Sequence, residues 1–176
     1  EMNINYLDAL GDPAKPDENL ATKASRFLCS QAIMLALRGV PGIYFHSLFG
    51  SQNWNEGVEI TGRNRTINRE KLQLEQLEHA LADPHSLRYQ VFSGFHHMLK
   101  IRQTNPAFHP MGGQQILDVG PAVFAILRTP LNEAAPTLCL HNVTAKTQEV
   151  EIALKDLCLA EVRSVTDRLS EKVYNL

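Results

Sequence analysis

The sequence predicts a mixed α/β fold in which helices and one buried strand precede a separate antiparallel β region. Two observations support this prediction. A helix-forming stretch at residues 20–38 is followed by Gly39, Pro41 and a short apolar, aromatic run at residues 42–46, and this order is one step of an α/β fold. After about residue 110, short β-rich runs alternate with turn residues, which is typical of antiparallel sheets.

The first long helix is expected to begin at Asn19, whose short polar side chain is a common N-cap, and to end near Gly39 with Pro41 just beyond. Apolar residues lie on both faces of its second half, so we expect the helix to be mostly buried. The run GIYFHS that follows is largely apolar and aromatic, as are strands covered on both faces of a parallel sheet.

Residues 47–66 form a polar stretch without periodicity, and Trp54, the single tryptophan of the chain, lies within it. Loops longer than about 12–15 residues are usually functional or disordered. Two helices are expected afterwards, one beginning at Asn68 and one with Asp83 as its cap and Pro84 in its first turn. The apolar face of the second helix is expected to include Leu87, Val91 and Phe95.

The β-rich runs after the helices are QQILDV, AVFAILRT, TLCLHNV, QEVEIAL and AEVRSVT, with turn-forming segments between them. Their spacing predicts an antiparallel domain of the β-sandwich kind. We therefore predict two domains: a mixed α/β domain at residues 1–108, and a small antiparallel β-sandwich-like domain at residues 109–176.

Composition argues against several classes of protein. The 176 residues carry a formal net charge of −2, without a basic stripe that would recruit nucleic acid or anionic lipid. Cys29, Cys139 and Cys158 are an odd, widely spaced set, which indicates a reducing compartment such as the cytoplasm. The sequence predicts no transmembrane helix and no signal peptide. Because the chain does not begin with Met, we expect it to start inside a longer protein.

Few residues carry a recognisable catalytic or metal-binding pattern. The seven histidines form no HExxH or Cys/His spacing, so no metal site is expected. His46 ends the expected strand, where α/β folds place ligands, although a structural histidine is commoner there. Glu56 and Glu59 could serve in acid–base chemistry, but solvated loop charge is the commoner explanation.

The segment TGRNRTINREKL, residues 61–72, leaves two interpretations open. Arg63, Arg65 and Arg69 alternate with asparagines just before an expected helix. Arginine presents a planar fork of donors that suits carboxylates, phosphate and paired sugar hydroxyls. The same residues could instead form a salt-bridged surface loop with nearby glutamates.

GVPGIYFHSLFGSQN followed by TGRNRTINREKL resembles the last barrel strand, its loop and the next helix of the sucrose phosphorylase group in glycoside hydrolase family 13, the α-amylase family. The resemblance covers residues 1 to about 110. It implies that residues 20–38 are the seventh helix and residues 42–46 the eighth strand of a (β/α)8 barrel. The predicted fold is then the C-terminal portion of that barrel followed by the β domain. Residues 47–69 would face the active site, which lies at the C-terminal ends of the strands.

The resemblance implies retaining transfer of glucose from sucrose or a related α-glucoside to inorganic phosphate, the co-substrate, without a further cofactor. An aspartate nucleophile and a glutamate acid–base catalyst carry this reaction in the family, and a third carboxylate assists. All three precede the segment that resembles the start of this chain. We therefore expect no catalytic residue in this chain and no activity from it alone. It would need a missing N-terminal barrel portion, or it would oligomerise.

Within the resemblance, the Gly-Arg-x-Ile-Asn-Arg pattern implies one arginine that binds glucose hydroxyls. Counting back from Ile-Asn-Arg places it at Arg65, and counting forward from the glycine places it at Arg63; we favour Arg65. Acceptor and phosphate contacts would reach Glu1. Trp54 replaces the aspartate of relatives, and it could stack on a sugar or pack within the loop.

Three functions stay open at this stage. The first is a phosphorylase whose acceptor is fructose, fructose 6-phosphate or glycerate. The second is an α-glucoside hydrolase or transglucosidase of the same family. The third is a non-enzymatic carbohydrate-binding or interaction module built on the β-rich tail. That tail contains few aromatic residues, Phe124 and Tyr174, which argues against a sugar-stacking surface.

Overall fold

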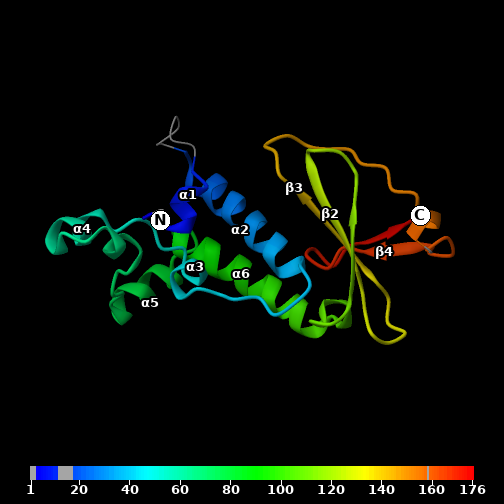
Figure 1. Cartoon of the computed structure of the whole chain (residues 1–176), viewed down its shortest axis with the longest axis horizontal. Helices are drawn as coiled ribbons and strands as arrows, with labels where there is room; N and C mark the ends of the chain where they lie inside the picture. Colours follow the sequence, from blue (N-terminus) through cyan, green and yellow to red (C-terminus); the bar gives the residue numbers. More distant parts are fainter. Residues whose placement is uncertain (1–2, 12–17, 158) are drawn as a thin grey trace. The chain divides into compact units, whose positions relative to one another are not determined.

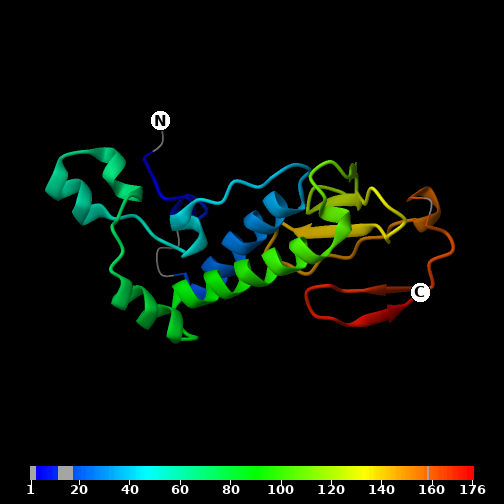
Figure 2. The same cartoon turned by 90° about the horizontal axis from the view of Figure 1, so that it is seen from below.

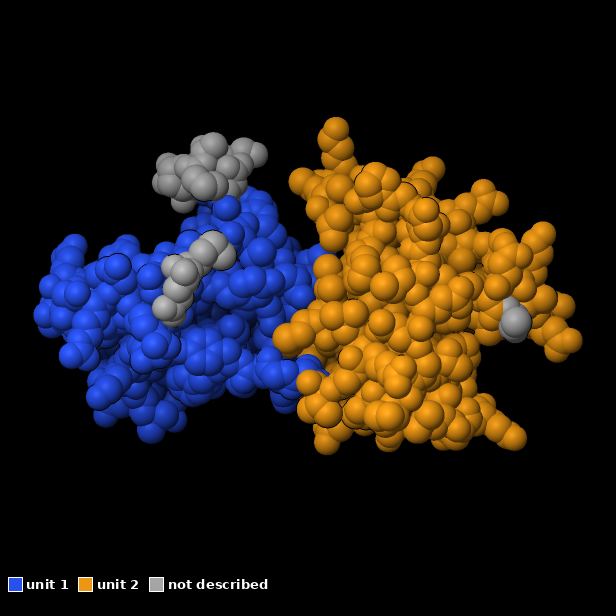
Figure 3. Space-filling model, viewed as in Figure 1, with its two compact units in different colours: residues 1–31, 41–96 blue, residues 32–40, 97–176 orange. Residues whose placement is uncertain are grey.

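A computed structural model describes residues 3–11, 18–157 and 159–176. The chain divides into two compact units, which are coloured in Figure 3. Unit 1 consists of Glu1–Gln31 and Pro41–His96, and unit 2 consists of Ala32–Val40 and His97–Leu176. The division therefore falls inside two long helices rather than at a single point of the sequence.

Helices dominate the first hundred residues. They are α1 (Tyr6–Ala9), α2 (Leu20–Ala36), α3 (Phe45–Leu48), α4 (Asn55–Thr61), the 3-10 helix η1 (Asn64–Asn68), α5 (Leu74–Ala82) and α6 (Leu87–Thr104). In unit 1, α2 and α6 lie side by side (Figure 1, Figure 2). Gly94 of α6 allows this approach, because a Cβ atom there would lie 2.5 Å from a methyl carbon of Leu28.

Both long helices form, as the sequence predicts. Asn19 caps α2, since its side-chain oxygen accepts a hydrogen bond from the backbone N–H of Thr22 at 2.9 Å. The buried residues of α2 are Ala24, Phe27, Gln31, Leu35 and Ala36. Its other residues are partly or largely exposed, so the expectation that the helix is mostly buried is wrong. The predicted apolar face of α6 is buried as well, at Leu87, Val91 and Phe95.

Two predicted helix starts are wrong. Asn68 ends η1 instead of capping a helix, and α5 begins at Leu74. Asp83 closes a turn, in which its carboxylate accepts from the backbone N–H of His85 at 2.9 Å. Helix α6 begins only after Ser86, whose hydroxyl accepts from the backbone N–H of Tyr89 at 2.9 Å.

The buried strand predicted at residues 42–46 does not form. The backbone is irregular up to Tyr44, and α3 begins at Phe45. A strand requires a neighbour for its backbone N–H and C=O groups, and no strand in the described part of the chain pairs with this run. Its apolar side chains are correspondingly exposed, with Tyr44 at 50% and Phe45 at 51%. The barrel portion remains a prediction.

The polar stretch at residues 47–66 is not structureless, contrary to the sequence prediction. It contains α4 and most of η1, and we call residues 54–69 the arginine excursion. Trp54 packs inside it, because a Cβ atom built on the buried Gly57 would lie only 2.2 Å from the indole ring. The tryptophan ring therefore takes the place that a side chain at position 57 would need.

This packing gives a testable prediction for Gly57→Ala. The added methyl group should displace the indole, which costs up to about 3 kcal/mol. Alanine gains roughly 1 kcal/mol over glycine in a helix, so the free energy of unfolding should fall by up to about 2 kcal/mol. Urea unfolding and Trp54 fluorescence measure both effects. Gly42→Ala is the matched control, since a Cβ atom there meets nothing within 4 Å. Equal stability and an unshifted emission spectrum in both variants would contradict the packing.

Unit 2 contains the β structure. Strands β1 (Gly113–Leu117), β2 (Val123–Thr129) and β3 (Thr137–Asn142) form an antiparallel sheet in the order β1-β2-β3, and β4 (Ser164–Thr166) and β5 (Val173–Asn175) form a hairpin. The short 3-10 helices η2 (Pro106–Phe108) and η3 (Leu154–Leu157) lie between them in the sequence. The antiparallel arrangement is confirmed, but QEVEIAL forms no strand, and the sandwich is not confirmed.

The core of unit 2 includes a fully buried arginine. Arg128 of β2 is 0% exposed and donates to the backbone carbonyls of Gly113, Ala36 and His109 at 3.0, 2.9 and 2.9 Å. Arg102 of α6 donates to the carbonyls of Leu35 and, at 2.6 Å, Gly39. The last carbonyls of a helix lack partners within it and attract cations. The two arginines therefore cap the C-terminus of α2.

Cys139 lies near the charges of these two arginines. Burial raises the pKa of its thiol to about 11, although Arg128 and Arg102 act in the opposite direction. The thiol is therefore protonated at neutral pH.

No helix in the described part of the chain is both long and apolar enough to cross a membrane.

Candidate functional site

The arginine excursion is closed at its base by hydrogen bonds within unit 1. The backbone N–H of Trp54 donates to the carbonyl of Ile67 at 2.8 Å. The hydroxyl of Tyr44 donates to the carbonyl of Asn68 at 2.9 Å. The hydroxyls of Thr61 and Thr66 lie 2.8 Å apart and join α4 to η1. Hydrogen bonds near its first and last residues thus fix the arginine excursion to unit 1.

This element brings together three of the four residues that the sequence predicted to bind substrate. Arg63 is the N-cap of η1 and Arg65 lies in its first turn, and both side chains are exposed. Trp54 is only partly buried but packs on Gly57, so a role in sugar stacking stays a prediction. Glu1 lies outside the described residues. Neither arginine is singled out by the geometry, so the choice between Arg63 and Arg65 stays open.

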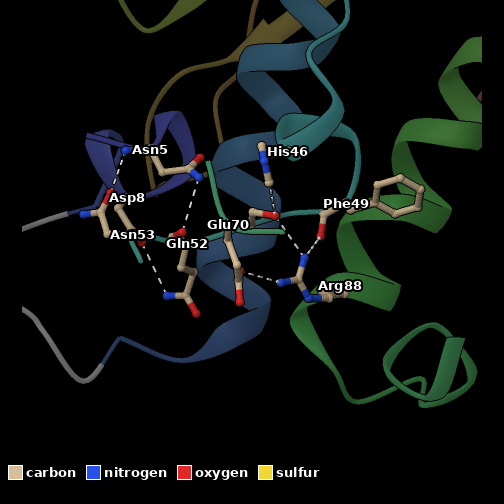
Figure 4. A network of polar contacts seen from close by, with 9 residues as sticks. Asn5, Asp8, His46, Phe49, Gln52, Asn53, Glu70 and Arg88 are labelled. Carbon is tan, nitrogen blue, oxygen red and sulfur yellow. Dashed lines mark hydrogen bonds and ion pairs between the residues drawn. The ribbon is translucent and has the colours of Figure 1, made fainter. Parts of the chain in front are cut away.

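A network of polar contacts precedes the excursion (Figure 4). The carboxylate of Asp8 accepts from the backbone N–H of Asn53 at 2.5 Å and from the side chain of Gln52 at 3.4 Å. Asn5, which is 3% exposed, donates its backbone N–H to the side chain of Asn53 at 2.6 Å. The sequence alone does not reveal this network, because Asn5 and Asp8 lie more than forty residues from their partners.

A second set of contacts involves His46, Ser51, Arg88 and Glu70. Ser51 is 1% exposed, and its hydroxyl lies 3.0 Å from Nδ1 of His46 and 3.0 Å from a guanidinium nitrogen of Arg88. Arg88 also donates to the carbonyl of Phe49 at 3.1 Å and lies 3.6 Å from the carboxylate of Glu70. Burial lowers the pKa of His46, Glu70 raises it, and Arg88 lowers it further.

The described residues of this region provide groups that could bind a ligand, and the expectation of no catalytic residue in this chain stays a prediction. Exposed arginines on a held element can bind phosphate or polyhydroxylated ligands. Glu56 and Glu59 of α4 are exposed. No group of three His, Cys, Asp or Glu side chains in the described part of the chain could hold a metal ion.

The chain is similar in sequence to glucosylglycerate phosphorylases of three organisms. No protein-family profile matches the sequence. The chain is 50% identical over 149 residues to the glucosylglycerate phosphorylase of Spirochaeta thermophila, a match that covers 85% of the chain and 25% of the relative. The glucosylglycerate phosphorylases of Allomeiothermus silvanus and Escherichia coli are 39% identical over 157 residues and 34% identical over 152 residues. These two matches cover 28% and 26% of the relatives.

The chain thus spans about a quarter of the length of the curated relatives it matches. The predicted resemblance to the C-terminal part of a sucrose phosphorylase-like enzyme is confirmed at the level of the family.

Proposed function

We propose that this chain is one section of a glycoside phosphorylase that transfers glucose from glucosylglycerate to inorganic phosphate with retention. The observation that carries the proposal is the 50% identity over 149 residues to a glucosylglycerate phosphorylase. Glycerate is one of the acceptors that the sequence left open, and the names of all three relatives favour it over fructose. Sucrose is therefore not our first choice of substrate.

Within this proposal, the arginine excursion supplies the donor-sugar contacts. Its exposed Arg65 would bind two hydroxyls of the glucosyl group through the guanidinium fork. The acid–base catalyst and the nucleophile would come from sequence beyond this chain. We place the whole enzyme in the cytoplasm because the three widely spaced cysteines fit a reducing compartment.

A chimeric enzyme tests the proposal directly. The segment of the Spirochaeta thermophila relative that aligns with this chain over 149 residues is exchanged for the corresponding residues of this chain. The chimera should release glucose 1-phosphate from glucosylglycerate and phosphate, and should act much more weakly on sucrose. The isolated chain should release none.

Three controls make the outcome decisive. The unaltered relative gives the reference rate, and a chimera with the exchanged segment in reversed order gives the background. Circular dichroism of the chimera establishes that it folds. A folded chimera with only background activity would contradict the proposal, as would release of glucose 1-phosphate by the isolated chain.

A further inference from the structure

Arg88 joins segments of unit 1 that are far apart in the sequence. From α6 it reaches the carbonyl of Phe49 at 3.1 Å, the hydroxyl of Ser51 at 3.0 Å and the carboxylate of Glu70 at 3.6 Å (Figure 4). Phe49 and Ser51 belong to the turn that leads into the arginine excursion, and Glu70 directly follows the excursion. One side chain thus contacts residues that precede and follow the arginine excursion in the sequence.

The turn itself sits directly on α6. Gly50 has a φ of 59°, a left-handed conformation that favours glycine, and a Cβ atom there would lie 3.0 Å from Val91. The backbone N–H of Ser51 donates to the carbonyl of His46 at 2.9 Å and closes the turn. The turn at residues 46–51 therefore packs closely on α6 at Gly50, and the contacts of its side chains add to this packing.

The hydrogen bonds of this turn are all satisfied when His46 is neutral and carries its proton on Nε2. Arginine has only donors, so the hydroxyl oxygen of Ser51 accepts from Arg88. The single hydroxyl proton of Ser51 is then available for Nδ1 of His46 at 3.0 Å. Nδ1 can accept it only in the neutral imidazole that carries its proton on Nε2.

We propose that Arg88 is a positioning residue for the base of the arginine excursion, and that its hold on the turn at residues 46–51 depends on an uncharged His46. A proton on Nδ1 would turn an acceptor into a donor. The Ser51 oxygen has two lone pairs and could accept from both neighbours, but its own proton would lose Nδ1 as an acceptor in a side chain that is 1% exposed. A protonated His46 would also carry a positive charge near that of Arg88. The guanidinium of Arg88 disfavours this charge, and the carboxylate of Glu70 favours it. The rings of Tyr44 and Phe45 pack against the imidazole, with centroids 5.4 Å away in both cases.

The direction of the pH effect follows from this arrangement. Burial lowers the pKa of His46 below its ordinary value of 6.5, Glu70 opposes this shift, and Arg88, the smallest of the three effects, lowers the pKa further. The folded state therefore favours the neutral ring. The stabilisation is complete above about pH 6.5 and is lost as the pH falls from there through the folded-state pKa. Burial also lowers the pKa of His141, so a site-resolved measurement is required.

Long-range nitrogen–proton NMR of the imidazole rings in this chain tests the proposal. At pH 8, His46 should show the Nε2–H tautomer, and its titration midpoint should lie below 6.5. Arg88→Met should raise that midpoint and shift the amide signals of Phe49, Gly50 and Ser51. Arg26→Met is the matched control, because Arg26 pairs with Glu18 at 2.6 Å elsewhere in unit 1 and should leave His46 unchanged.

A second variant separates the pH effect from a general loss of structure. His46→Asn keeps an acceptor near the position of Nδ1 but cannot titrate, so the amide signals of residues 49–51 should become independent of pH between about 5 and 7. An Nδ1–H tautomer, or a His46 midpoint at or above 6.5, would overturn the proposal. So would amide signals that titrate as in the wild type after His46→Asn. The experiment does not depend on the phosphorylase proposal, because it measures the isolated chain.

Discussion

Arg65→Ala in the chimeric phosphorylase is expected to lower kcat/KM for phosphorolysis of glucosylglycerate by about 100-fold or more. A hydrogen bond to a charged group contributes about 1.5–3 kcal/mol, and the guanidinium fork would make two such bonds to the glucosyl hydroxyls. Both bonds involve the donor sugar, so a similar loss is expected for every acceptor. Initial rates of glucose 1-phosphate formation measure the effect.

Arg63→Ala is the matched control for this prediction, because Arg63 lies two positions away in the same excursion and is also exposed. It should cost less than about tenfold. Arg65→Lys should recover little activity, because an ammonium group cannot bind two oxygens in the planar geometry of a guanidinium. A severe loss in Arg63→Ala with near wild-type turnover in Arg65→Ala would show that the register counted forward from Gly62 is correct.

The second large effect is expected from Arg128→Met in unit 2. The substitution removes donors from three backbone carbonyls, those of Gly113, Ala36 and His109, and leaves them without this partner. An unsatisfied buried group costs about 1–3 kcal/mol, and the removal of the buried charge offsets part of the sum. We expect the free energy of unfolding to fall by about 3 kcal/mol, as measured by urea denaturation.

Arg128→Lys should fall between the wild type and Arg128→Met, because lysine keeps the charge but loses the fork. Arg163→Met is the control for removal of an arginine, since Arg163 is exposed and makes a single long bond, 3.3 Å, to the carbonyl of Ala160. Its effect should lie within about 0.5 kcal/mol. If Arg128→Met were no worse than Arg163→Met, the buried guanidinium would not stabilise the end of α2.

The long helices could be predicted from the sequence because their signals are local. Apolar residues at a spacing of three and four residues, and an asparagine before the first turn, act within one helix. The strand at residues 42–46 was predicted wrongly because a strand is not a local structure. Its composition is suitable for a sheet, but its hydrogen bonds depend on a neighbour that composition does not reveal.

The candidate site could be predicted only in part. Arg63 and Arg65 were proposed because they match a known pattern, and Trp54 because it lies close to them in the sequence, where relatives carry an aspartate; their roles stay predictions. The supporting contacts were not recognised, since Arg88 acts on Ser51 and Glu70 from a different helix. The same holds for Arg128, which lies in the β-rich run AVFAILRT and reaches the carbonyl of Ala36. Tertiary hydrogen bonds of this kind leave no periodic pattern in a sequence.

The contact between Arg128 and the end of α2 limits how this protein can be recombined. A shuffling experiment guided by sequence alone would exchange the β-rich part by cutting at residue 109. That cut leaves Arg128 facing a foreign helix terminus, although Ala32–Val40 belongs to the same compact unit as the sheet. Unit 2 is therefore discontinuous in the sequence, and an exchange that preserves it must carry residues 32–40 and 97–176 together.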